Sequence, residues 1–202
     1  MDVNADLDRA SVARDTGELL PPFMLPTVGG ETIRRHDYRG RRHLALYFAD
    51  AVDCAACRAA LAALAERYSD CRAAGAEVLA IIPADNAGDG VEGRGPSGEG
   101  RRASSHPRSS ALGPQPSPLA GAPYPVLCDA EGRVRERYGA CTATGEPRAA
   151  LFVADRHGEI VLRAVAAHRP VGGDGAPRGE GHGLPVDEIL PLLELLQMRC
   201  AI

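Results

Sequence analysis

The residues with the clearest chemical potential are two cysteines, Cys54 and Cys57, separated by two alanines. A buried strand is expected to end just before them and a helix to begin at them. Two thiols at this spacing on the first turn of a helix can close a disulfide. The unpaired backbone N–H groups and the positive end of the helix dipole stabilise a thiolate there, and the thiolate is the nucleophilic form of cysteine. Arg58 adds positive charge beside the pair. The motif therefore predicts thiol redox chemistry.

The elements around this motif form a β-α-β unit. Residues 43–49 are an apolar run that predicts a buried strand. Apolar residues at three- and four-residue spacing predict a helix over 54–74, and Gly75 is placed to end it. A second buried strand is expected over 77–82. This order implies parallel strands joined by a right-handed crossover.

The rest of the chain is expected to complete one domain over residues 18–202, after a flexible leader over residues 1–17 that lacks periodicity. Two glycine-rich segments, residues 84–122 and residues 170–183, interrupt the pattern of predicted strands and helices. Residues 84–122, rich in Gly, Pro and Ser, predict a disordered low-complexity insertion, because they cannot bury enough apolar surface to offset the entropy of ordering. The other expected elements are an extended arm over 20–28, a strand over 124–129, a helix over 131–138, a hairpin of 149–154 with 159–165, a Gly-rich loop over 170–183, and a C-terminal helix from 186 in which Pro191 marks the first turn or a kink.

Composition excludes several function classes. All 23 basic residues are arginine, so there is no lysine for a Schiff base or a P-loop. The net charge of −4 and the absence of tryptophan argue against nucleic acid as a partner. No apolar run is long enough to span a membrane, and the polar, acidic N-terminus is unlike a secretory signal. A cytoplasmic protein is therefore expected. Six cysteines are too few for a disulfide scaffold, so a close pair favours redox chemistry or metal binding.

Several stretches resemble the redoxins, in particular the alkyl hydroperoxide reductase/thiol-specific antioxidant (peroxiredoxin) family and the thioredoxin-like disulfide reductases. The resemblance covers roughly residues 18–83 and 123–165. It implies an α/β protein with the thioredoxin-like fold, a central mixed β-sheet flanked by helices. The stretches that carry it are residues 19–28, 37–42, 54–61, 77–81, 125–129 and 152–160.

The resemblance implies a thiol-dependent oxidoreductase that reduces peroxides through a Cys54/Cys57 redox pair. Two alternatives stay open. The double cysteine is also typical of a thioredoxin-like protein disulfide reductase. A redox-inert binding module with the same fold would keep the elements and lose the chemistry. An enzyme of either redox type would need an external dithiol reductant, either a thioredoxin-like protein or a low-molecular-weight thiol. The resemblance is also compatible with a homodimer.

The two redoxin groups assign the cysteines differently. The peroxiredoxin pattern Pro-x-x-x-Thr-x-x-Cys, laid on this chain without gaps, places the peroxidatic cysteine at Cys57. Asp50 then stands at the proline position and Cys54 at the threonine position. The thioredoxin pattern makes Cys54 the attacking thiol and Cys57 the resolving one. The resemblance also implies a thiolate-stabilising role for Arg148. It lies one residue from the position where an ungapped alignment puts the family's active-site arginine.

The remaining titratable residues are given smaller roles. Cys71 and Cys128 are expected in the core, whereas Cys141 and Cys200 are alternative resolving thiols. Asp50 and Asp53 are interpreted as solvated loop acids rather than proton acceptors. No histidine lies beside the cysteine pair in the sequence, and there is no second Cys-x-x-Cys motif or paired histidine. No metal and no cofactor are therefore predicted.

Overall fold

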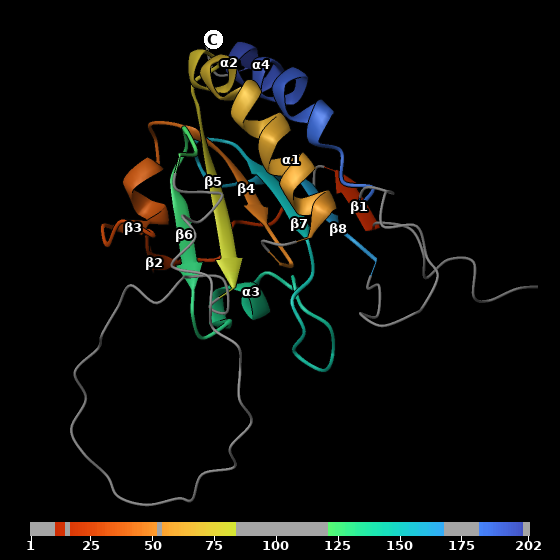
Figure 1. Ribbon diagram of the computed structural model, residues 1–202. Coiled ribbons are helices and arrows are strands. Elements are labelled where there is room, and N and C mark those ends of the chain that lie inside the picture. The colour runs from red at the N-terminus through yellow and green to blue at the C-terminus, as the bar shows by residue number, and fades with distance from the viewer. Residues whose placement is uncertain (1–10, 15–16, 52–53, 84–120, 168–181, 200–202) are drawn as a thin grey trace, which may run out of the picture.

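The predicted β-α-β unit consists of β4 (His43–Phe48), α1 (Ala55–Glu66) and β5 (Ala76–Pro83), and its two strands are neighbours in a six-stranded mixed sheet with the order β1-β8-β7-β4-β5-β6. The computed structural model describes residues 11–14, 17–51, 54–83, 121–167 and 182–199 (Figure 1). β4 pairs in parallel with β5, and β5 with β6, whereas β7, β8 and β1 continue the sheet antiparallel. The strands are β1 (Ser11–Arg14), β4 (His43–Phe48), β5 (Ala76–Pro83), β6 (Val126–Asp129), β7 (Ala150–Ala154) and β8 (Ile160–Val165).

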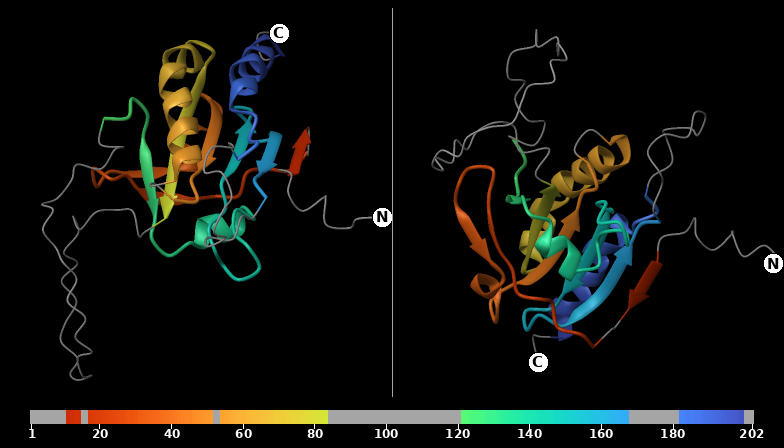
Figure 2. Two further views of the ribbon diagram at one scale, coloured as in Figure 1. Left: turned by 45° about the vertical axis from the view of Figure 1, so that its right-hand side comes forward. Right: turned by 90° about the horizontal axis from the view of Figure 1, so that it is seen from below.

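Helices cover both faces of this sheet, as Figures 1 and 2 show. α1 (Ala55–Glu66), α2 (Tyr68–Ala73) and α4 (Ile189–Arg199) pack on one face. The short helix α3 (Arg133–Arg137) packs on the other face, together with the antiparallel pair β2 (Met24–Pro26) and β3 (Thr32–Arg34). This is the predicted thioredoxin-like arrangement of a mixed sheet between helices.

Strand β4 shows how alternation assigns side chains to the two layers. Ala45 and Tyr47 point toward α1, whereas Leu46 and Phe48 point toward α3. All residues of β4 are buried, because both faces of a central strand are covered. Tyr47 therefore reaches the helix that bears the cysteines, while Phe48 packs against the opposite layer.

The helix after the cysteines is divided in two. Arg67, with φ −99° and ψ 1°, separates α1 from α2, where the sequence predicts one continuous helix over 54–74. Contacts made by the next residue favour the break. The Tyr68 ring packs edge-on against Tyr124 at 5.9 Å, and its hydroxyl donates a hydrogen bond to buried Glu77 at 2.6 Å. Tertiary packing has overridden helix periodicity at this point.

The N-terminal segment also differs from the prediction. Ser11–Arg14, inside the segment expected to be a flexible leader, form β1 on the edge of the sheet beside β8. Backbone pairing with β8 needs no apolar periodicity in the added strand, which is why the sequence pattern does not reveal it. The predicted low-complexity insertion and the Gly-rich loop lie, apart from their ends, outside the described residues.

Pro191 lies in the first turn of α4, after a short 3₁₀ turn, Val186–Glu188. The first turn of a helix tolerates proline because its N–H groups have no partner within the helix. The placement matches one of the two expectations for this residue.

Gly75 joins α2 to β5 in a left-handed conformation with φ 73°, as expected for a residue that ends a helix. A Cβ here would lie 2.6 Å from Oε1 of Gln197. We expect Gly75→Ala to lower the free energy of unfolding by ~1–2 kcal/mol through backbone strain, and by more where Gln197 must move.

Gly40 provides a matched control for this prediction. Its φ is 74°, and an added Cβ would meet nothing within 4 Å. Gly40→Ala therefore reports the backbone cost alone. Urea unfolding of both variants separates the two contributions, and a Gly75→Ala protein as stable as the wild type would contradict the prediction.

Candidate active site

The two cysteines lie at the start of α1 in different environments. Cys54 is the N-cap residue and is half-buried, whereas Cys57 lies one turn into the helix and is completely buried. Both are free thiols. Cys57 shares the inward face of α1 with Leu61 and Leu64, so helix periodicity directs it into the core. Only Cys54 is thus open to a substrate that arrives from solvent.

The Cys57 sulfur is held by two polar side chains. Its thiol donates a hydrogen bond to Oδ1 of Asp50 at 2.7 Å, and the Tyr47 hydroxyl donates to the sulfur at 3.5 Å. Burial, together with the hydrogen bond to Asp50 and its negative charge, raises the pKa of Cys57 to about 12. Cys57 is therefore a protonated thiol at neutral pH, beside a group able to accept its proton.

Asp50 follows the C-terminal end of β4 and turns back toward the helix. Burial alone would raise the pKa of this carboxyl, but hydrogen bonds from His182 and Cys57 outweigh it and hold the pKa below its ordinary value. The Ala51 N–H also donates to Oδ1 at 2.6 Å. The expectation of a solvated loop acid is wrong for Asp50, since its side chain is only 28% exposed and contacts both Cys57 and His182. Asp53 lies outside the described residues.

His182 completes the cluster from a distant part of the chain. It lies just before the 3₁₀ turn that leads into α4, and its side chain is 14% exposed. Its Nε2 lies 3.4 Å from each of the two cysteine sulfurs and 3.4 Å from Oδ2 of Asp50. This histidine is 125 positions from Cys57 in the sequence. Spacing along the chain therefore had no means of revealing it.

Two arginines bear on the sequence predictions, Arg148, which the sequence singled out, and Arg135, which it did not. The Arg148 guanidinium donates to the Ala166 carbonyl through Nε at 2.8 Å and through Nη2, so it is tied to the backbone beside β8. Arg135 of α3 is 2% exposed, and its guanidinium lies 5.5 Å from the centre of the Phe48 ring.

Arg135 is a buried cation that interacts electrostatically with the cluster. Burial lowers the pKa of its guanidinium, and the charges of Asp129, Asp50 and Cys57 oppose this effect. It donates to the carbonyl oxygens of Ile81 at 3.4 Å and of Arg148 at 3.1 Å. A buried arginine beside ionisable groups stabilises their negative charge. The only sequence signal for it is a cation within an otherwise ordinary short helix.

The other predicted residues that the structure describes are not members of the cluster of four side chains. Arg58 is exposed on α1 beside Cys57 in sequence. Cys141 is half-buried in the loop between α3 and β7, where its backbone forms an isolated antiparallel β-bridge with Pro147. Cys200 lies outside the described residues. Cys71 is buried on α2, as expected, whereas Cys128 on β6 is only half-buried. The resolving roles of Cys141 and Cys200 stay predictions.

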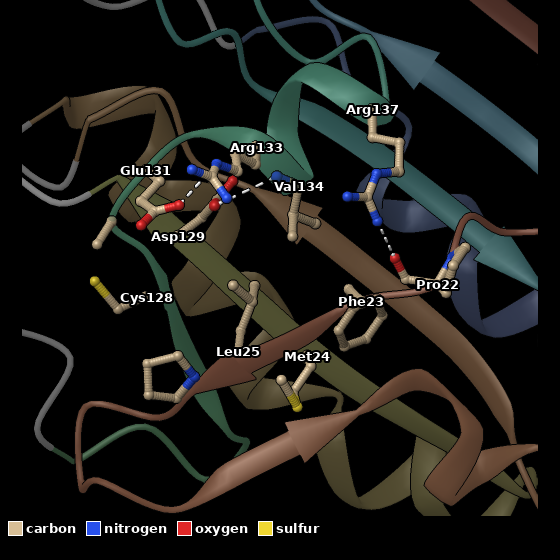
Figure 3. A pocket seen from close by; sticks show the side chains of 12 residues that line it. Pro22, Phe23, Met24, Leu25, Cys128, Asp129, Glu131, Arg133, Val134 and Arg137 are labelled. Atoms are coloured by element: carbon tan, nitrogen blue, oxygen red, sulfur yellow. Dashed lines mark hydrogen bonds and ion pairs between the residues drawn. The ribbon is translucent and has the colours of Figure 1, made fainter.

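The pocket drawn in Figure 3 lies elsewhere, between the N-terminal arm and α3. It has a volume of about 640 Å³, and residues 22–26 of the arm form one wall. Cys128 is part of its lining, and Arg137 closes one side by donating to the Pro22 carbonyl at 2.7 Å. None of the four side chains of the cluster, namely the two cysteines, Asp50 and His182, lines this pocket.

A central mixed sheet with a paired-cysteine helix start after a parallel strand defines a thioredoxin-like redoxin. The model of the AhpC/TSA family matches residues 16–163, and the chain belongs to this family. Its activity class is that of a thiol-dependent peroxidase or oxidoreductase. No curated protein matches the sequence.

Solved structures with the same fold come from both redoxin groups. AhpC of Mycobacterium tuberculosis is 17% identical with a TM-score of 0.58, covering 91% of this chain and 93% of that one. Peroxidoxin BcpB from the same organism is 15% identical with a TM-score of 0.57, covering 91% and 98%. A thiol:disulfide interchange protein, DsbE, of Chlorobium tepidum is 23% identical with a TM-score of 0.52, covering 78% and 89%.

Among the helices that the structure describes, none is long and apolar enough to cross a membrane.

The two thiols should differ sharply in alkylation. Under native conditions near neutral pH, we expect iodoacetamide to modify Cys54 well before Cys57, which is buried and has a pKa of about 12. In a Cys54→Ser variant, the labelling rate of Cys57 should keep rising with pH toward that value, whereas an ordinary thiol levels off above ~8.5. Peptide mapping by mass spectrometry measures both rates. A Cys57 rate that levels off like an ordinary thiol would favour the redox-inert alternative.

Proposed function

We propose that the chain reduces peroxides, with Cys54 as the attacking thiol and Cys57 as the resolving thiol. The observation that carries the proposal is the asymmetry of the pair. Cys54 is half-buried at the helix start, whereas Cys57 is completely buried and donates a hydrogen bond to Asp50 at 2.7 Å. A peroxide from solvent reaches the first sulfur and not the second. This asymmetry favours Cys54 over the ungapped peroxiredoxin assignment of Cys57.

In the first step His182 acts as the general base and then as the general acid. In the tautomer that carries its proton on Nδ1, His182 accepts the Cys54 thiol proton at Nε2 across 3.4 Å; this leaves a thiolate beside an imidazolium, whose Nε2–H can then donate to Asp50. The thiolate attacks one peroxide oxygen, so an S–O bond forms while the O–O bond breaks. The imidazolium then protonates the departing oxygen, which leaves as water or an alcohol. Cys54 is oxidised to a sulfenic acid and the peroxide is reduced.

In the second step Asp50 acts as the general base for the Cys57 thiol. The Cys57 sulfur attacks the Cys54 sulfenic sulfur while Asp50 accepts the Cys57 proton across the 2.7 Å contact. The S–S bond forms, the S–O bond breaks, and the departing hydroxide takes this proton and leaves as water. Buried Arg135 stabilises the negative charge that develops on the Cys57 sulfur as its proton leaves. An external dithiol then reduces the disulfide by thiol exchange.

Disulfide reduction is the second candidate function, and the Cys57–Asp50 contact favours it equally. A mixed disulfide at Cys54 would be resolved by the same buried thiol and the same carboxylate. The two functions therefore differ only in what reaches Cys54. A thioredoxin-like protein or a low-molecular-weight thiol is the proposed reductant in the peroxidase cycle, and the cytoplasm, where thiols are kept reduced, is the proposed location.

The test is a time course of thiol oxidation. Fully reduced protein, treated with a metal chelator, is mixed with one equivalent of hydrogen peroxide, quenched at intervals and mapped by mass spectrometry. A Cys54–Cys57 disulfide that forms much faster than a free thiol oxidises supports peroxide reduction. Oxidation at the rate of a free thiol, together with rapid reaction with an aromatic disulfide, would replace it by disulfide reduction. A fast bridge to Cys141 or Cys200 would reassign the resolving thiol.

A further inference from the structure

Four metal-ligating side chains converge at the start of α1. The cluster consists of Asp50, Cys54, Cys57 and His182, and one donor atom from each lies within 4.8 Å of all the others. The four side chains come from the end of β4, the first turn of α1 and the segment before α4. Three separate parts of the chain therefore supply one carboxylate oxygen, two sulfurs and one imidazole nitrogen.

The spacing of these donors suits a tetrahedral cation. With Zn–S bonds of ~2.3 Å and Zn–N and Zn–O bonds of ~2.0–2.2 Å, tetrahedral coordination separates neighbouring donors by about 3.4–3.8 Å. His182 Nε2 lies 3.4 Å from both sulfurs and 3.4 Å from Asp50 Oδ2. The Cys57–Asp50 contact, at 2.7 Å, is shorter because a proton lies between the two atoms. A metal would replace this proton.

Groups around the donors hold them in place. The Ala51 N–H donates to Asp50 Oδ1, and the Tyr47 hydroxyl donates to the Cys57 sulfur. Hydrogen bonds of this kind orient ligands and tune a metal site. The cluster is also largely shielded, with Cys57 buried and His182 only 14% exposed. Thiolates, imidazoles and carboxylates are all zinc ligands, so a set of two thiolates, one imidazole and one carboxylate suits Zn²⁺.

We propose that the reduced chain binds one Zn²⁺ ion through Cys54, Cys57, His182 and Asp50. Binding displaces the two thiol protons to solvent, and no electron is transferred. The proposal requires only that both thiols be reduced, so it stands independently of the redox cycle. Because both sulfurs would be ligands, bound zinc and the Cys54–Cys57 disulfide exclude one another. Zinc would therefore protect the pair from oxidation until the ion is removed.

The experiment measures metal binding to the reduced full chain, without peroxide. Titration with Zn²⁺ against a chromophoric chelator gives stoichiometry and affinity, and Co²⁺ in place of Zn²⁺ reports geometry by its absorption. We expect one ion per chain, with intense visible bands of tetrahedral Co²⁺ and sulfur-to-metal charge transfer. Each of His182→Ala and Asp50→Ala should weaken Zn²⁺ binding more than ~10-fold, and Cys57→Ser more than ~100-fold, since even residues that only orient a ligand cost ~10–100-fold.

Cys128→Ser is the matched control, because it removes a half-buried thiol outside the cluster. It should bind Zn²⁺ as the wild type does. Wild-type affinity in both His182→Ala and Asp50→Ala would overturn the four-ligand site, as would octahedral Co²⁺ spectra or the absence of stoichiometric Zn²⁺ in the wild type. The Co²⁺ spectrum of the wild type decides the matter even where a variant fails to fold. A chain that binds Zn²⁺ and yet oxidises slowly with peroxide in chelator would refute only the proposed peroxidase function.

Discussion

Replacing Cys54 with serine is expected to abolish rapid reaction with hydrogen peroxide, whereas Cys57→Ser should keep the first oxidation and stop there. The half-exposed Cys54 sulfur can meet a peroxide, and the buried Cys57 sulfur cannot. Among the described residues, Cys57 is the only other thiol in the cluster, so without it the sulfenic acid at Cys54 should accumulate. Trapping with a sulfenic-acid-specific nucleophile, followed by peptide mapping, measures this difference. The loss in Cys54→Ser should reach at least ~10²-fold, because removing the attacking nucleophile costs more than removing a group that only transfers a proton, which contributes ~10²–10⁴-fold.

The reverse result would restore the ungapped peroxiredoxin assignment. A Cys54→Ser protein that is oxidised rapidly at Cys57 would mean that the helix start opens far enough to admit peroxide. Cys71→Ser serves as the control, since this thiol is buried on α2, away from the cluster. It should leave the oxidation rate unchanged. Sulfenic acid that disappears in Cys57→Ser through a new disulfide would identify Cys141 or Cys200 as the partner thiol.

Most of the fold could be predicted because periodicity, turns and apolar runs are local. The strands over 43–49 and 77–82 and the parallel crossover between them are where the sequence placed them. The break at Arg67 and the edge strand Ser11–Arg14 were missed. Both depend on partners distant in the sequence, namely the Tyr124 ring and strand β8, and no local pattern encodes them.

The site was predicted only as far as local signals reach. The cysteine pair and its position at a helix start follow from spacing, but His182 enters from the segment before α4. Asp50 could have been ranked higher from local information. It lies seven positions before Cys57, at the end of a buried strand, where a carboxylate faces the start of the next helix. Arg135 was hidden because α3 packs on the other face of the sheet.

The second large effect is expected for Asp50→Asn, which replaces the carboxylate that accepts the Cys57 proton. An amide cannot accept the Cys57 proton as a base, so condensation of Cys57 with the Cys54 sulfenic acid should slow by ~10²–10⁴-fold. The initial oxidation of Cys54 should change far less, because its proton goes to His182 at 3.4 Å. Stopped-flow peroxide consumption, combined with the lifetime of the trapped sulfenic acid, separates the two steps. Chelator is present throughout, so that a bound metal cannot mask the effect.

The pH dependence distinguishes a proton acceptor from a merely structural carboxylate. The pKa of Asp50 lies below its ordinary value, so in the wild type this group stays ionised and the condensation rate should not follow its titration between about pH 5 and 8. In Asp50→Asn, condensation must wait for spontaneous ionisation of a buried thiol, so its rate should rise with pH across that range. Asp187→Asn, which removes a largely exposed partner of Arg67, should behave as the wild type does. If Asp50→Asn instead slows both steps equally at every pH, the carboxylate only holds His182 in place and Cys57 loses its proton by another route.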